Sequence, residues 1–189
     1  MLMGSLPNLN FQTFYVSKEE SNCPLISIVV KFCKKLKDLN LLENINETVI
    51  SLRYGKRILI TTDTSDIQNL TKEDFLEIVD YNPIKKILLI IGPKAPRIET
   101  PVHWLIHHAR DEINVIIQMN DKNFSKGLGN KVPVTEKEYP SGTIEQTKEI
   151  LKKLRDSKIV LIKNQGVLFV GGSIKEIEET IIRTFEELK

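Results

Sequence analysis

Apolar residues in the first half of the chain change their spacing twice, and each change predicts a new element. From about Pro24 to Leu41 they recur every three or four positions, which predicts an amphipathic helix with proline at its first turn. Two pairs of short β-rich runs follow, at 49–62 around Gly55-Lys56 and at 75–91 around Asn82-Pro83. Each pair predicts a hairpin, so antiparallel pairing rather than strand–helix–strand crossovers should dominate this half of the sheet.

The second half alternates between helical and strand-like spacing. Ser173 and Glu176 form a predicted capping box, in which a hydroxyl and a carboxylate satisfy free N–H groups at the start of the last helix. The pattern predicts an α/β protein with helices packed against a mixed, mostly antiparallel sheet. The predicted elements are a helix at 100–110, a strand at 114–120, a short strand at 131–134, a helix at 143–155, a hairpin at 158–170 and the final helix.

The first 22 residues differ from the rest of the chain. They have neither a basic start nor an apolar run, so we expect no secretory signal there but a loosely ordered arm. Residues 23–189 are predicted to form a single domain, because no Pro-, Gly- or Ser-rich linker divides them. No apolar stretch approaches the ~20 residues that a membrane-spanning helix needs.

Charge and cysteine content narrow the classes of function. Lys and Arg total 27 against 25 for Asp and Glu, and the net charge of +2 gives no strong field for a nucleic acid or an anionic membrane. Cys23 and Cys33 have no partner pair, so neither a disulfide framework nor a zinc knuckle is indicated, and we expect a cytoplasmic protein. A high content of Ile, Lys and Glu with few Cys and Met is typical of thermophile proteins.

Five segments occur in an order and spacing that resemble the class II aldolase/adducin family, over roughly Pro24 to the C-terminus. The resemblance implies a three-layer α/β/α fold and a homo-oligomer, commonly a ring-shaped tetramer. The segments are Ser51-Leu52-Arg53-Tyr54-Gly55, Leu59-Ile60-Thr61-Thr62, Glu99-Thr100-Pro101-Val102-His103, the run from Asn114 to Asn120, and Lys163-Asn164-Gln165-Gly166-Val167.

The resemblance also implies a zinc ion held by three histidines, but this chain has Gln118, Asn120 and Gln165 at those positions. In the family's enzymes zinc polarises the substrate carbonyl and stabilises the enediolate. A carboxamide offers only a weak, uncharged oxygen in place of an imidazole nitrogen. We therefore predict no high-affinity zinc site and no other cofactor. A loose oxygen site for Mg²⁺ or Ca²⁺, helped by Glu99, is the alternative.

The phosphate-binding turns that the resemblance implies are altered as well. The chain has Thr48-Val49 in place of Gly-Asn, Asp63-Thr64-Ser65 in place of a Thr-Gly or Ser-Gly turn, and Arg97-Ile98 in place of Ser-Ser. Asp63 would repel a phosphate and Val49 cannot hydrogen-bond to one, which disfavours a phosphorylated sugar. Arg97 could reach an anion or serve as a surface salt-bridge partner.

Glu99 is the one chemical residue of the family that this chain retains. The resemblance makes it the candidate general acid/base, while its place before a helix also suits a carboxylate that favours the helix dipole. We predict that Ser51, Gln118, Asn120 and Gln165 line a ligand pocket beside it.

Glu99, His103 and His107 are four residues apart in turn, and His108 lies next to them. The outer two would be separated by about 12 Å along a helix, too far to share one ion. Metal binding by a neighbouring pair is one interpretation, and buried histidines with ordinary hydrogen bonds are the default. Trp104 on the same helix is interpreted as a packing residue.

Three functions remain open at this point. The first is a repurposed aldolase-like protein without zinc-dependent activity, which binds a small polar ligand or acts through its oligomer. The second is a lyase or related proton-transfer enzyme that acts on a sugar, phosphorylated or not, with Glu99 as general acid/base. The third is a zinc lyase with other ligands.

Overall fold

The computed structural model describes residues 9–41, 47–63, 66–120 and 126–187. Eight strands form one sheet in the order β1-β5-β4-β3-β2-β6-β8-β7. Only β1 and β5 are parallel, and the other neighbours pair antiparallel. The strands are β1 (Gln12–Ser17), β2 (Thr48–Tyr54), β3 (Arg57–Thr61), β4 (Phe75–Asn82), β5 (Ile87–Ile91), β6 (Val115–Met119), β7 (Ile159–Ile162) and β8 (Gly166–Gly171).

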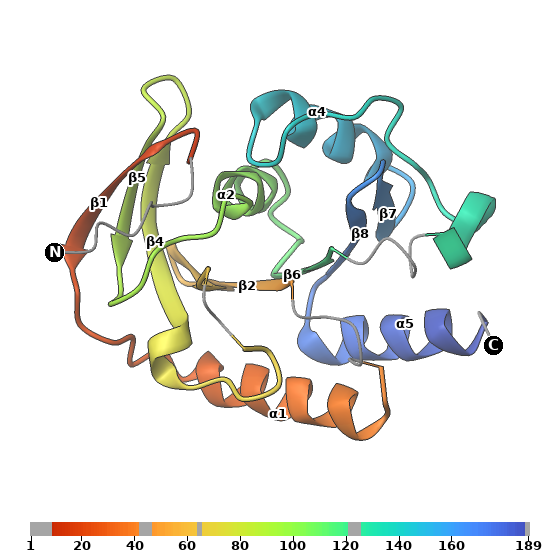
Figure 1. Cartoon of the computed structure of the whole chain (residues 1–189), viewed down its shortest axis with the longest axis horizontal. Helices are drawn as coiled ribbons and strands as arrows, with labels where there is room; N and C mark the ends of the chain where they lie inside the picture. The colour runs from red at the N-terminus through yellow and green to blue at the C-terminus, as the bar shows by residue number, and fades with distance from the viewer. Residues whose placement is uncertain (1–8, 42–46, 64–65, 121–125, 188–189) are drawn as a thin grey trace, which may run out of the picture.

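Helices cover both faces of this sheet (Figure 1). Helices α1 (Leu25–Asp38) and α5 (Ile174–Glu186) lie on one face, and α2 (Thr100–Ala109) and α4 (Ile144–Lys153) lie on the other. Residues 126–128 are helical, and the described part of the chain also has 3-10 turns at Lys72–Asp74 and Gly129–Lys131. The predicted three-layer α/β/α fold with a mixed, mostly antiparallel sheet is confirmed.

Burial on both faces explains the nearly continuous apolar run of β6. Ile117 packs with the α1 and α5 side of the core, whereas its neighbour Ile116 packs with the α2 and α4 side. All five residues of β6 are buried, because a central strand between two helical layers has no face in water. Gln118 belongs to this strand, so its polar side chain is buried in the core.

Two segments differ from the sequence-based predictions. Residues 12–17 form the strand β1 rather than a loose arm, because their backbone pairs with β5. Residues 131–134 form no strand: Gly129–Lys131 is a 3-10 turn, and Val134 makes a single bridge to Leu161. Pro133 lies in this segment and has no N–H to give to a ladder.

The buried face of α1 consists of Ile26, Val29, Phe32, Cys33 and Leu36. Ile28 and Leu39 lie off this face and are 46% and 45% exposed. Half of the predicted capping box is present at α5: the Ser173 hydroxyl accepts from the Glu176 N–H, but the Glu176 carboxylate accepts from Gly172 instead. In the described part of the chain, no helix has the length and apolar character to cross a membrane.

Candidate functional site

The polar residues singled out from the sequence meet where β6 ends. Gln118 belongs to β6, Asn120 follows that strand, and Glu99 directly precedes α2. Gln165 lies in the turn between β7 and β8. Gly166 lets this turn approach β6, because a Cβ there would lie 2.1 Å from the Met119 carbonyl oxygen and 2.8 Å from Asn120 Cα.

A directed chain of hydrogen bonds joins three of these side chains. Gln118 Nε2 donates to Asn120 Oδ1 at 2.8 Å, and Asn120 Nδ2 donates to Glu99 Oε1 at 2.8 Å. The other carboxylate oxygen of Glu99 lies 3.6 Å from Arg97 Nε in a buried ion pair. Gln118, Glu99 and Arg97 are buried, and Asn120 is half-buried. Asn120 is therefore the most accessible of these four residues.

The structure refines the interpretation of Glu99 and Arg97. Glu99 occupies the N-cap position of α2, but its side chain makes no capping hydrogen bond. Its carboxylate is directed to Asn120 and Arg97 instead. Arg97 is not a surface residue: it is 8% exposed, and its Nη1 donates to the carbonyl oxygens of Thr62 and Asp63 at 3.5 and 3.4 Å.

Gln165 takes part in a separate network. Its Oε1 accepts hydrogen bonds from Ser141 Oγ at 3.1 Å and Gln146 Nε2 at 2.6 Å, and its Nε2 donates to the Tyr139 carbonyl at 2.7 Å. These bonds tie Gln165 to the segment before α4 and to the first turn of α4. Gln165 is thus in a different hydrogen-bonded group from Gln118 and Asn120.

The donor set does not fit a zinc ion. Two of the three carboxamide oxygens that would have to bind the metal, Asn120 Oδ1 and Gln165 Oε1, already accept hydrogen bonds within the protein. Within the described residues, no three His, Cys, Asp or Glu side chains are grouped closely enough to hold a metal. Neutral amides that are occupied in this way are poor ligands for zinc.

Ser51 lies between two histidines of α2, and one of them, His103, adjoins the Gln118 side chain. Its Oγ is 2.8 Å from His103 Nδ1 and 2.9 Å from His107 Nε2, and all three residues are 0% exposed. His107 Nδ1 lies 3.0 Å from the Ile113 carbonyl oxygen. A carbonyl only accepts, so this nitrogen carries the proton and His107 Nε2 accepts from Ser51. Ser51 in turn accepts from His103 Nδ1, which leaves His103 Nε2 as a lone-pair acceptor.

Burial keeps both imidazoles neutral. Desolvation lowers the pKa of His103 to about 3, the neighbouring His107 adds to this effect, and the side chain of Gln118 opposes it. Desolvation likewise lowers the pKa of His107 to about 3, while its hydrogen bond to Ile113 opposes the shift. The default interpretation of these histidines, as buried residues with ordinary hydrogen bonds, is confirmed. The bridging role of Ser51 was missed, since its partners lie 52 and 56 residues away along the chain.

Trp104 and His108 occupy the outer side of α2. Their rings are stacked with centroids 3.6 Å apart, and Trp104 also meets the Tyr81 ring edge-on at 5.8 Å. Trp104 packs against the buried cluster that contains Tyr81, so the packing role predicted for it is confirmed.

Comparisons with known proteins agree with this architecture. An L-fuculose 1-phosphate aldolase shares 18% identity at a TM-score of 0.72, with 89% of this chain and 84% of that chain covered. The L-fuculose-1-phosphate aldolase of Thermus thermophilus shares 19% identity at a TM-score of 0.68, covering 87% and 90%. A sugar-phosphate aldolase from Thermotoga maritima shares 20% at 0.64, covering 86% and 92%.

At these identities the solved structures establish the fold alone. A search of curated proteins finds no significant match. Residues 27–123, about half of the chain, match the family described as "Class II Aldolase and Adducin N-terminal domain". The chain therefore belongs to the class II aldolase/adducin family.

Proposed function

We propose that this protein is a repurposed family member that binds a small polar ligand and does not catalyse zinc-dependent cleavage of a carbon–carbon bond. One observation carries the proposal: the amide oxygens of Asn120 and Gln165 accept hydrogen bonds at positions where the family's enzymes need imidazole lone pairs for zinc. Cleavage by this route needs a Lewis acid that stabilises the enediolate, often the largest contribution to the rate.

The remaining groups are suited to recognition. Amides both donate and accept hydrogen bonds, and the half-buried amide of Asn120 is bonded directly to the buried Glu99 carboxylate. A ligand with several hydroxyl groups could replace water at Asn120 and use these directed bonds. The absence of a strong field from the net charge of +2 fits an uncharged or weakly charged ligand at this position.

The second candidate is a lyase or proton-transfer enzyme for a sugar in which Glu99 moves the proton. The buried carboxylate without a capping role favours this function, because no structural duty at the helix end explains its presence. Against it, each carboxylate oxygen of Glu99 already has a partner, Asn120 for one and Arg97 for the other.

Metal content tests the main proposal. Protein purified without added metal should contain far less than one zinc per chain by elemental analysis. The triple variant Gln118→His, Asn120→His, Gln165→His should gain zinc toward one per chain, because it restores three nitrogen donors. Asn69→His, on an exposed residue, is the control and should gain none. One tightly held zinc per chain in the unaltered protein would overturn the proposal.

Ligand screening separates the two candidates. A thermal-shift series with free and phosphorylated sugars should raise the melting temperature for at least one free sugar, without cleavage products detectable by chromatography. Glu99→Gln should retain that shift, because the amide keeps the hydrogen bond to Asn120 when it turns its oxygen toward Nδ2. Cleavage that is lost in Glu99→Gln would instead establish the enzyme.

The oligomer and the cellular location belong to the same proposal. The resemblance supports a homo-oligomer, with a tetramer as the expected size, and two buried free cysteines support a reducing, cytoplasmic setting. Light scattering on the purified chain should give about four times the mass of one chain. A monomer at micromolar concentration would remove the oligomer from the proposal.

A further inference from the structure

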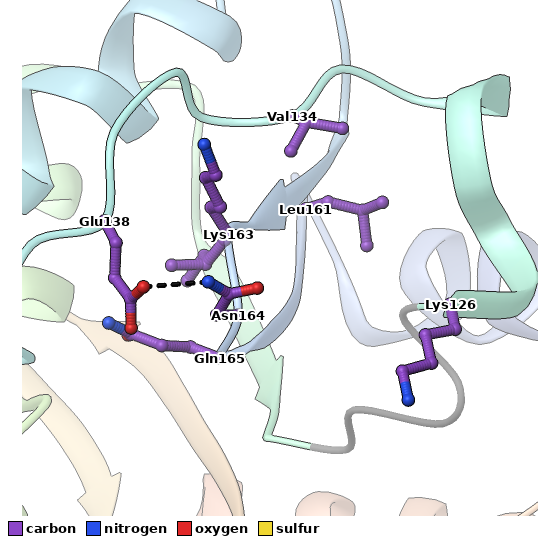
Figure 2. Close-up of a pocket in the computed structure, with 8 residues that line it drawn as sticks. Lys126, Val134, Glu138, Leu161, Lys163, Asn164 and Gln165 are labelled. Atoms are coloured by element: carbon purple, nitrogen blue, oxygen red, sulfur yellow. Dashed lines mark hydrogen bonds between the residues drawn. The ribbon is translucent and has the colours of Figure 1, made fainter.

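A cavity of about 490 Å³ opens beside the β7–β8 turn. Figure 2 shows Lys126 on one side of it and Glu138, Asn164 and Gln165 on the other. Val134 and Leu161 lie between these two sides, and Ile162 and Lys163 complete the lining. The volume is within the range of small-molecule sites, which are characteristically apolar with a few polar groups at fixed positions.

Hydrogen bonds hold one wall of this cavity in place. Asn164 Nδ2 donates to Glu138 Oε2 at 2.8 Å, and Asn164 adopts the left-handed conformation that asparagine tolerates, with φ of 60°. Gln165 is fixed by its three bonds to residues 139–146. The apolar floor is fixed too, because Leu161 exchanges backbone hydrogen bonds with Pro133 and Thr135. The cavity is thus formed before any ligand arrives.

The charged groups around the cavity favour an anion. Lys126 and Lys163 line it against one carboxylate, that of Glu138, which is already bonded to the Asn164 amide. Lys163 Nζ donates to the Glu136 carbonyl at 3.2 Å and has further N–H groups to offer. The Glu136 carboxylate is paired with Lys152 and Lys153 instead, so the lining itself carries two ammonium groups and one carboxylate.

We propose that this cavity binds a small organic anion with an apolar body. The apolar part lies on Leu161 and Val134, and the anionic group lies at Lys126, whose long flexible side chain can close on it. The amides of Asn164 and Gln165 form the opposite wall. This ligand differs in charge from the one proposed at Asn120, so the inference depends neither on the proposed function nor on whether zinc is bound.

Fluorescence titration of the full chain with 8-anilino-1-naphthalenesulfonate tests the proposal, because this probe joins an aromatic body to a sulfonate. We expect one site per chain. Lys126→Glu, a change on an exposed side chain, should weaken binding by about 10-fold or more, since it reverses the charge next to the sulfonate. Val134→Trp should weaken it similarly by filling the cavity. N-phenyl-1-naphthylamine, which lacks the sulfonate, should bind more weakly and should not respond to Lys126→Glu.

The control is Lys31→Glu, which lies in another basic groove, between α1 and α5, with Ile28 and Lys175. This variant should bind the probe like the unaltered protein. Unchanged affinity in both Lys126→Glu and Val134→Trp would overturn the proposal, and so would a loss confined to Lys31→Glu. Circular dichroism of each variant confirms that it is folded. Zinc found in the unaltered protein would overturn the proposed function but leave this titration as the test of the cavity.

Discussion

Two polar clusters lie next to each other around α2, and they are built on opposite principles. Ser51, His103 and His107 form a closed cluster with no exposed surface, in which hydrogen bonds determine the position of every proton but leave His103 Nε2 unfilled. The Gln118–Asn120–Glu99 hydrogen-bond chain begins and ends at buried side chains, but its middle member, the amide of Asn120, is half-buried. The first cluster can only stabilise the fold, whereas in the second the half-buried Asn120 can exchange a hydrogen bond within the protein for one to a ligand.

The comparison shows why residue type alone is a poor guide to a metal site. The chain has three histidines, and two of them are neutral members of the closed cluster. The positions that would hold a metal carry amides that hydrogen-bond to the protein. Burial and partners therefore distinguish a structural imidazole from a ligand, which a count of histidines does not.

Acidification should produce the largest effect on the closed cluster. Burial lowers the pKa of His103 and His107 from 6.5 to about 3, so the folded protein takes up these protons much later than the unfolded chain. Their contribution to the free energy of unfolding is complete above about pH 6.5. It is lost between pH 6.5 and 3, by up to about 1.4 kcal/mol per histidine and pH unit. Urea unfolding at several pH values measures this slope.

His108→Gln provides the matched control for the pH series. Its ring is exposed and stacks on Trp104, outside the closed cluster, so this variant should keep the loss of stability that the two buried imidazoles produce. A flat pH profile for the unaltered protein would show that water reaches the two buried imidazoles, and the contrast between the clusters would disappear.

Ser51→Ala should have the next largest effect. The change removes the hydroxyl between the two rings and leaves His103 Nδ1 and His107 Nε2 buried without partners. With about 1–3 kcal/mol for each of these two groups, we expect a loss of about 2–6 kcal/mol in the free energy of unfolding. Ser27→Ala, where an exposed hydroxyl donates to the Pro24 carbonyl, should change it by less than about 0.5 kcal/mol. Equal losses in the two variants would contradict the closed cluster.

Asn120→Ala should have the smallest effect. Its two partners, Gln118 and Glu99, lose one hydrogen bond each, but Asn120 is half-buried and water can enter the space that it leaves. We expect a loss of about 0.5–1 kcal/mol by the same urea titration. A loss above about 2 kcal/mol would mean that water has no better access to Asn120 than to the Ser51, His103 and His107 cluster.

Local patterns were sufficient to predict most of the fold. These patterns depend on residues that are close together in the sequence. They are the helical spacing before residue 41, the turns at Gly55 and Asn82-Pro83, and the final capping residues. β1 was missed because its partner β5 lies 75 residues further along the chain. The predicted strand at 131–134 failed because one bridge beside a proline does not make a ladder.

The site was less predictable for the same physical reason. The sequence identified Glu99, Gln118 and Asn120, and the structure joins them. The sequence could not show that Gln165 would bond to residues 139–146, or that Ser51 would bridge two imidazoles. These hydrogen bonds join segments that are far apart in the sequence. They depend on how the turns and the helix pack against the sheet, which residue spacing does not reveal.

The strand β1 has a practical consequence. It is the last strand at one end of the sheet, and its Phe14 and Val16 are 52% and 59% exposed. A chain shortened to begin at residue 18 would uncover the backbone edge of β5, whose Leu88 and Ile90 are fully buried. Such an unprotected edge invites pairing between molecules. Shortened versions made for crystallisation should therefore keep residues 9–17, or they will tend to aggregate.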